Sequence, residues 1–204
     1  AVCSPLNPTG TSFDAQELAQ ICDLIIEENR KREGRKPLYL LYDQIYCALT
    51  LGGSKHVDPV SLRPEMREYT IYIDGISKAF AATGVRVGWA FGPLNVINKM
   101  RALLSHVGAW SPKPEQMATA KFLANRTAVS ESIQKHRSMI SERVDKLYNG
   151  IQGLKELGFP VDAIQAEGAM YLTVKIDLVG ATTPSGELLD DAEAVTMFLI
   201  REAK

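Results

Sequence analysis

The sequence contains no hydrophobic run that approaches the roughly 18 residues needed to span a bilayer, so we expect no membrane segment. Its charges nearly cancel, with 23 basic and 24 acidic side chains and a formal net charge of −1. We therefore predict neither a nucleic-acid partner nor an anionic membrane partner. His56, His106 and His136 are scattered without the spacing of metal ligands, which predicts no metal site.

Cysteine is scarce as well. Cys3, Cys22 and Cys47 are an odd set without C-x-x-C spacing, which argues against a disulfide framework and favours buried thiols of a reducing compartment. We accordingly expect a cytoplasmic protein. The sequence shows neither a signal peptide nor an initiator methionine, and it opens at Ala1 inside what the pattern predicts to be the end of a buried strand. This suggests a piece of a larger protein.

A dense turn signal, Asn7-Pro8-Thr9-Gly10, separates this strand from a predicted helix. Asp14, with Glu17 three residues later, forms a plausible capping box for the helix, and Gly34 is the expected stop. The helix carries one apolar face at 3.6-residue spacing, made of Leu18, Ile21, Cys22, Ile25 and Ile26.

Three short apolar runs follow the pattern of strands. Residues 38–42 form an unbroken apolar run, which is the pattern of a strand covered on both faces. Residues 69–73 and 85–91 show similar apolar runs. Strands that alternate with helices imply an α/β fold with a mostly parallel sheet. The ligand crevice of such a sheet lies beyond the carboxyl ends of its strands.

The second half has a different character. An apolar stripe from Ile133 to Leu154 predicts one long helix that begins at about Pro114. A strand over 169–176 and a second amphipathic helix over 192–203 follow it. We divide the chain into part of a large domain (1–112), a long connecting helix (113–150) and a partial α+β small domain (151–204).

Four features fall at predicted strand ends, where a ligand site is expected. They are Asn7-Pro8-Thr9-Gly10, Asp43-Gln44-Ile45-Tyr46, Ser77-Lys78, and Gly84-Val85-Arg86-Val87-Gly88. Together they supply a carboxylate, a phenol, an amine and a guanidinium. A lysine whose pKa is lowered by burial or by cationic neighbours suits carbonyl–amine chemistry, and an arginine between glycines offers a forked grip on phosphate.

These strings, in this order, resemble the class I/II aminotransferases of the aspartate aminotransferase superfamily, which use pyridoxal phosphate (PLP). The pattern from Ser77-Lys78 to Gly84-x-Arg86-x-Gly88 is similar to the family's PLP-lysine signature, and Ala169 to Ile176 is similar to its small-domain strand. The resemblance covers nearly the whole chain. It implies an incomplete PLP-transferase fold of type I and transfer of an amino group between an amino acid, of aspartate or aromatic type, and a 2-oxo acid.

The resemblance assigns catalytic roles to three residues. Lys78 would hold PLP as an internal aldimine and then act as general base and acid. Asp43 would pair with the pyridinium nitrogen and keep it protonated. Tyr46 would hydrogen-bond the phenolic oxygen of PLP.

Four further residues would bind the cofactor. Asn7 would join Tyr46 at the phenolic oxygen and lie near the substrate carboxylate. Ser77 and Arg86 would bind the phosphate, and Ile45 would cover one face of the ring. The upstream phosphate loop should precede Ala1, and the arginine that grips the substrate carboxylate should follow Lys204. We therefore expect the 204 residues alone to be inactive and the parent enzyme to be a homodimer.

Alternatives remain at this stage. The same signature occurs in PLP-dependent C–S lyases and elimination enzymes, and in PLP-sensing domains of transcriptional regulators. Without the resemblance, Lys78 would be an ordinary surface lysine, Asp43 a turn cap, and Asn7 a turn residue before Pro8. Tyr171 could face the mouth of the active site, but core packing is its simpler interpretation.

Overall fold

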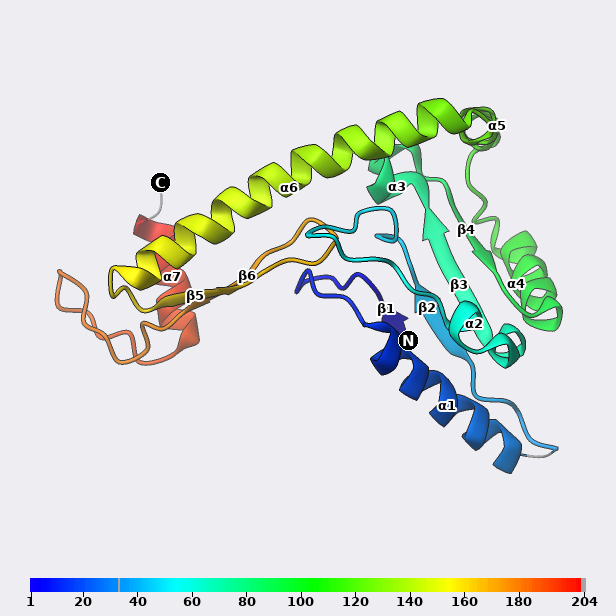
Figure 1. Ribbon diagram of the computed structural model, residues 1–204, viewed down its shortest axis with the longest axis horizontal. Coiled ribbons are helices and arrows are strands. Elements are labelled where there is room, and N and C mark those ends of the chain that lie inside the picture. The colour runs from blue at the N-terminus through cyan, green and yellow to red at the C-terminus, as the bar shows by residue number, and fades with distance from the viewer. Residues whose placement is uncertain (33, 203–204) are drawn as a thin grey trace.

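The computed structural model in Figure 1 describes residues 1–32 and 34–202. Its main sheet has the strand order β1-β2-β3-β4, with β1, β2 and β3 parallel and β4 antiparallel to β3. The strands are β1 (Val2–Cys3), β2 (Leu40–Asp43), β3 (Thr70–Gly75) and β4 (Gly88–Phe91). The prediction of an α/β fold with a mostly parallel sheet is confirmed.

Helix α1 (Ala15–Lys31) connects β1 to β2 and begins with the predicted capping box. The backbone N–H of Glu17 donates to Asp14 Oδ1 (2.8 Å), and the N–H of Asp14 donates to Glu17 Oε2 (3.0 Å). The predicted apolar face packs against the sheet and the short helical segments that precede β3. This core contains Leu18, Cys22, Ile25, Ile26, Leu40, Tyr42, Met66 and Tyr72.

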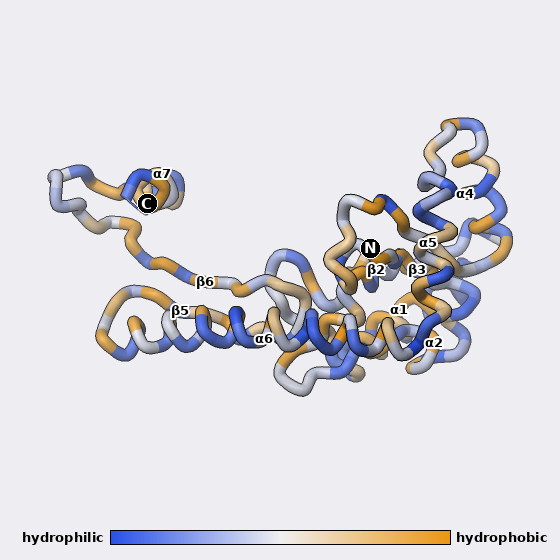
Figure 2. The backbone as a smooth tube through the Cα atoms, turned by 90° about the horizontal axis from the view of Figure 1, so that it is seen from above, coloured by the Kyte–Doolittle hydropathy of each residue, from blue (hydrophilic) through white to orange (hydrophobic). Residues whose placement is uncertain are grey.

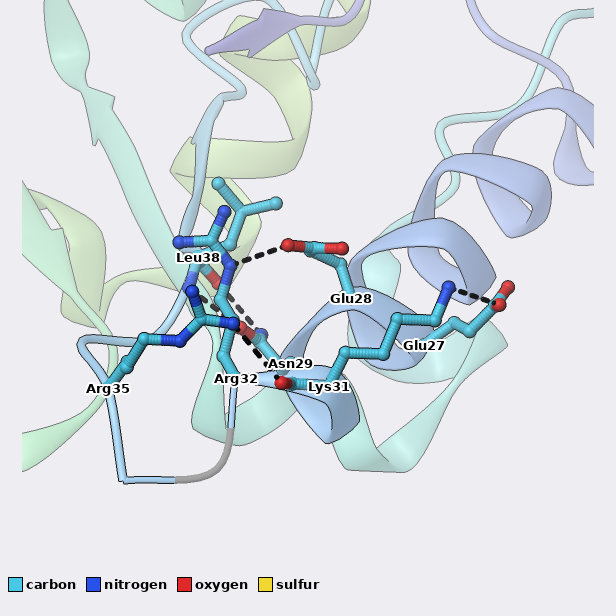
Figure 3. A network of polar contacts seen from close by, with 7 residues as sticks. All are labelled: Glu27, Glu28, Asn29, Lys31, Arg32, Arg35 and Leu38. Carbon is cyan, nitrogen blue, oxygen red and sulfur yellow. Dashed lines mark hydrogen bonds and ion pairs between the residues drawn. The ribbon is translucent and has the colours of Figure 1, made fainter.

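Figure 3 shows how the end of α1 is joined to the next strand. The side-chain amide of Asn29 donates to the carbonyl of Leu38 (2.9 Å), and its oxygen accepts from the N–H of Leu38 (2.7 Å). The helix ends at Lys31, whose ammonium pairs with Glu27 one turn earlier. Gly34, the expected stop, lies three residues beyond that end and has a left-handed φ of +73°.

The two faces of β2 differ, which corrects one expectation. Leu40 and Tyr42 are buried under α1, whereas Leu41 between them is 40% exposed. The prediction of a strand covered on both faces is therefore wrong for this chain, because α1 packs on the Leu40 and Tyr42 side. The strand expected over 85–91 begins only at Gly88, because Thr83–Val85 form a 3₁₀ turn (η2) and Arg86 has a φ of +59°.

Two helices, α5 (Lys113–Ala124) and α6 (Arg126–Glu156), replace the single long helix expected after about Pro114. They separate at Asn125, whose side-chain oxygen accepts from the N–H of Ala128 (3.1 Å). An asparagine that caps a new helix in this way offers the backbone an alternative to continuing the old one. Ahead of them, α4 (Leu94–Val107) follows β4.

Helix α6 extends away from the main sheet to a second, smaller unit, as Figures 1 and 2 show. There β5 (Val161–Ile164) pairs antiparallel with β6 (Thr173–Ile176), and α6 packs against β5. Helix α7 (Ala192–Glu202) completes the unit; Ala203, included in the expected helix, lies outside the described residues. Within the described ranges, no helix combines the length and apolar character required to cross a membrane.

Candidate active site

The loop after β1 forms the predicted turn. The N–H of Leu6 donates to the carbonyl of Thr11 (2.8 Å), and the N–H of Gly10 donates to the carbonyl of Leu6 (2.9 Å). Asn7 is exposed within this loop. Gly10 has a φ of +74°, and its carbonyl accepts from the backbone of the second unit, at Glu167 (2.8 Å) and Gly168 (3.0 Å). The Asn-Pro-Thr-Gly turn is thus held between the two units.

Asp43 ends strand β2, in register with Cys3 on one side and Ile73 on the other. Its Oδ1 accepts from the N–H of Ile45 (3.0 Å), which closes a tight turn after the strand. Tyr46, one residue further on, is only 2% exposed. Burial raises the pKa of the Tyr46 phenol above its ordinary value, so this phenol keeps its proton at neutral pH.

Lys78 lies on the single-turn helix α3 (Ile76–Ala79) that directly follows β3, and it is half-buried. Backbone bonds close this turn, from Phe80 to the carbonyl of Ile76 (3.3 Å) and from Ala82 to the carbonyl of Ser77 (3.1 Å). The chain therefore presents the lysine from a short, internally bonded segment at the carboxyl end of a parallel strand, where an α/β sheet places its ligands.

Ser77 and Arg86 belong to one compact loop. The hydroxyl of Thr83 donates to the carbonyl of Ser77 (3.2 Å), and Nη1 of Arg86 donates to the carbonyl of Thr83 (3.0 Å). Arg86 has a left-handed backbone, and its side chain is exposed. The loop brings a hydroxyl and a guanidinium close to the lysine turn.

Gly75 explains how this loop can fold back so closely on β3. A Cβ added to Gly75 would stand 2.9 Å from the carbonyl oxygen of Val87, closer than real Cβ contacts come. The N–H of Ile76 donates to the same oxygen (3.3 Å). The added atom would also stand 3.4 Å from Cδ1 of Ile45, so the Ile45 side chain reaches from the end of β2 to the end of β3.

Strand register gathers the predicted residues at one edge of the sheet. Cys3, Asp43 and Ile73 are adjacent across three strands, and Gly75 is paired with Gly88, two residues after Arg86. The functional roles given to these residues remain predictions. Among the residues that the structure describes, no three histidine, cysteine or acidic side chains gather as metal ligands would.

Sequence reasoning missed one half-buried carboxyl, that of Asp74, beside Asp43. Asp74 Oδ1 accepts from the N–H of Gly75 (2.7 Å), and Oδ2 accepts from the side chain of Gln44 (3.2 Å). Burial raises the pKa of Asp74, and the charge of Asp43 adds to the effect. Only the alignment of β2 with β3 could have revealed this pair, since no motif includes Asp74.

Tyr171 was interpreted as a core residue, and it does pack with the cluster around Tyr46. Its hydroxyl also contacts the hydroxyl of Tyr46 (2.5 Å). The two residues are 125 positions apart, so no local pattern predicts this contact.

Comparisons with known proteins agree with this geometry. The family model described as aminotransferase class I and II matches residues 1–202. An aspartate aminotransferase of Geobacillus stearothermophilus is 31% identical over 169 residues, covering 83% of this chain and 39% of that protein. A probable aspartate/prephenate aminotransferase of Thermus aquaticus is 33% identical over 171 residues, covering 84% of this chain and 40% of its own length.

Solved structures show the same relationship. The aspartate aminotransferase of Thermus thermophilus with maleate superposes with a TM-score of 0.77 at 30% identity, over 98% of this chain and 46% of that one. An aspartate aminotransferase from Rhizobium meliloti reaches a TM-score of 0.83 at 24% identity, over 99% of this chain and 47% of that one, and supports the fold. The chain thus spans less than half the length of these relatives. It belongs to the class I and II aminotransferases, a family of PLP-dependent enzymes with the type I fold.

Proposed function

We propose that the full-length protein that carries this chain is a PLP-dependent aminotransferase, which moves an amino group between an L-amino acid and a 2-oxo acid. An aspartate-type or aromatic substrate is proposed because the relatives carry the names aspartate and aspartate/prephenate aminotransferase. The observation that carries the proposal is the position of Lys78, on a closed turn at the carboxyl end of β3, beside the strand that Asp43 ends.

The chemical character of the side chains at this edge fits PLP. A primary amine, a carboxylate, a phenol and a guanidinium are the partners that its aldehyde, ring nitrogen, phenolic oxygen and phosphate require. Bound PLP supplies an aldehyde for amine capture and a ring that takes up the electrons released at the substrate α-carbon. Gly75 permits the close approach of the Arg86 loop to β3, which keeps the phosphate-binding residues near the lysine turn.

Each residue has a defined task in this proposal. The amine of Lys78 would hold the cofactor at its aldehyde group and, when free, would move a proton at the substrate α-carbon. The Asp43 carboxylate would accept the hydrogen bond of the ring N–H. Tyr46 would donate a hydrogen bond to the phenolic oxygen, and its raised pKa keeps the phenol protonated at neutral pH.

The remaining residues position the cofactor. Asn7 donates to the same phenolic oxygen, Ser77 and Arg86 bind the phosphate, and Ile45 covers one ring face. These roles are supported by the exposure of Asn7 in the loop after β1 and by the reach of the Ile45 side chain to the end of β3.

Four further proposals concern the chain and the whole protein. The division at about residues 112 and 150 separates sheet, connecting helices and small unit, although α6 continues to Glu156. A homodimer is supported by large exposed apolar side chains on and after α4, namely Leu94, Leu103, Val107 and Trp110. A cytoplasmic location is supported by the unpaired thiols of Cys3, Cys22 and Cys47. The isolated 204 residues are proposed to be inactive.

Borohydride reduction of the full-length protein mixed with PLP, followed by peptide mass mapping, tests the assignment. We expect one phosphopyridoxyl adduct, confined to the Lys78 peptide. Lys78→Arg should abolish it, whereas Lys55→Arg, in an exposed loop, should not. An absent adduct, or one spread over surface lysines, would overturn the proposal.

Turnover that needs both an amino acid and a 2-oxo acid identifies transamination, whereas ammonia release from the amino acid alone identifies an elimination enzyme.

A further inference from the structure

The hydroxyl groups of Tyr46 and Tyr171 meet at 2.5 Å, and either oxygen could be the donor. The two rings are arranged edge to face, with centroids 5.7 Å apart and planes at 77°. Tyr46 follows β2 in the main sheet, and Tyr171 lies two residues before β6 in the second unit. A single hydrogen bond therefore connects a predicted cofactor ligand to the other unit of the chain.

Backbone and side-chain bonds fix Tyr171 in this place. The N–H of Ala169 donates to the carbonyl of Leu49 (2.8 Å), and the hydroxyl of Thr173 donates to the carbonyl of Thr9 (3.2 Å). With the two bonds to the Gly10 carbonyl, they hold the 167–173 segment against the loops that follow β1 and β2. The segment that carries Tyr171 is thus held in place by bonds other than the one to Tyr46.

The two tyrosines belong to one largely apolar cluster. Tyr46 packs with a core built from its own loop, α6 and the segment before β6, namely Leu49, Leu51, Ile140, Val144, Ala166 and Ala169. The titratable groups that act on Tyr46 are Tyr171, Cys3 and Asp43. In such an environment one hydrogen bond polarises the next one in a chain.

The number of protons that each phenol can donate determines the direction of the hydrogen bond between Tyr46 and Tyr171. A phenol has one proton to donate, while its oxygen can also accept. If the Tyr46 hydroxyl donates its hydrogen bond to a ligand, its oxygen can only accept a hydrogen bond from Tyr171. We propose that Tyr171 is a positioning residue: it donates to Tyr46 and so directs the Tyr46 proton toward the phenolic oxygen of PLP. This inference rests on the proposed function.

Tyr171→Phe in the full-length, PLP-loaded protein tests the inference, because it removes the hydroxyl and keeps the ring. Tyr46 becomes a weaker and less oriented donor, so the cofactor's phenolate is less stabilised. We expect the pH midpoint of the cofactor's visible absorbance to rise by about half a unit to one unit, and the dissociation constant for PLP to rise about three- to tenfold. Tyr69→Phe, in the separate core under α1, is the matched control and should change neither value.

The double variant separates positioning from a merely structural role. If Tyr171 acts through Tyr46, then Tyr171→Phe causes no further rise of the midpoint in a Tyr46→Phe background. Additive shifts, or a midpoint unchanged by Tyr171→Phe, would overturn the inference while the proposed function stands. Failure of the unmodified protein to form the Lys78 adduct would remove the proposed function and this inference with it.

Discussion

The Nδ1 atom of His136, in helix α6, lies 3.0 Å from the carbonyl oxygen of Ala79, the residue after Lys78. A second contact supports the same turn from α5, where Phe122 packs edge to face on Phe80 with centroids 5.1 Å apart. Both helices of the connecting segment therefore hold the lysine turn. His136, for which the sequence predicted no metal-binding role, thus supports the turn that carries Lys78.

Replacing His136 should loosen the lysine turn. His136→Leu removes the partner of the Ala79 carbonyl, and we expect a loss of about 1 kcal/mol in the free energy of unfolding. His136→Gln keeps a side-chain donor and should lose less. Denaturant titration of the full-length protein measures both. Equal losses for the two variants would show that ring packing, rather than the hydrogen bond, holds the turn.

Arg86 should be irreplaceable by lysine. The planar guanidinium forms two parallel bonds to a phosphate, whereas an ammonium acts as a point charge. We expect Arg86→Lys to weaken PLP binding about tenfold and Arg86→Ala about a hundredfold, from lost bonds to a charged group. Fluorescence titration of the apo-protein with PLP gives both values. Arg143→Lys, on an exposed position of α6, is the control; an Arg86→Lys protein that binds as well as the control would refute the phosphate role.

Gly10 should tolerate no side chain. Its φ of +74° disfavours other residues, and an added Cβ would also collide with the carbonyl oxygen of Tyr171. Gly108, at the end of α4, has a φ of +72°, and no described atom lies within 4 Å of a Cβ added there. Substitution of Gly108 should therefore introduce backbone strain without a steric clash. We expect Gly10→Ala to destabilise the protein by about 2 kcal/mol more than Gly108→Ala. Thermal and denaturant unfolding of the two variants would detect this; similar losses would exclude the collision.

Much of the fold could be predicted because its signals are local. The capping box of Asp14 and Glu17, and the spacing of Leu18 and Cys22, specify α1 without reference to the rest of the chain. Asn7, Asp43 and Lys78 were found because each follows a predicted strand, and parallel strands end at one edge. Arg86 instead precedes β4, which runs antiparallel to β3.

The features that escaped prediction depend on tertiary contacts. The exposure of Leu41 is decided by which side of the sheet α1 covers. The helix break at Asn125 is an exception, because it rests on a local side-chain cap. The bond between Tyr46 and Tyr171 arises only when the 167–173 segment lies against the loops that follow β1 and β2. No periodicity in a single segment encodes such relationships.

The buried thiol of Cys22 should make stability depend on pH in the alkaline range. Cys22, on the apolar face of α1, is fully buried, and burial raises the pKa of its thiol from 9.0 to about 11, with Arg63 opposing the shift. Between these values the unfolded chain loses the thiol proton while the folded chain retains it. The free energy of unfolding must therefore fall as the pH rises from about 9 to about 11.

The size of this fall can be isolated with Cys22→Ala. Two pKa units correspond to at most about 2.7 kcal/mol, and we expect roughly 2 kcal/mol from this thiol. The variant loses some stability at every pH because it leaves a cavity, so the slopes rather than the absolute values are compared. Tyr42 and Tyr72, whose pKa values are also raised by burial, contribute equally to both proteins. Urea titrations at several pH values should give a flatter curve for Cys22→Ala, and parallel curves would show that the thiol ionises as readily in the folded chain as in the unfolded one.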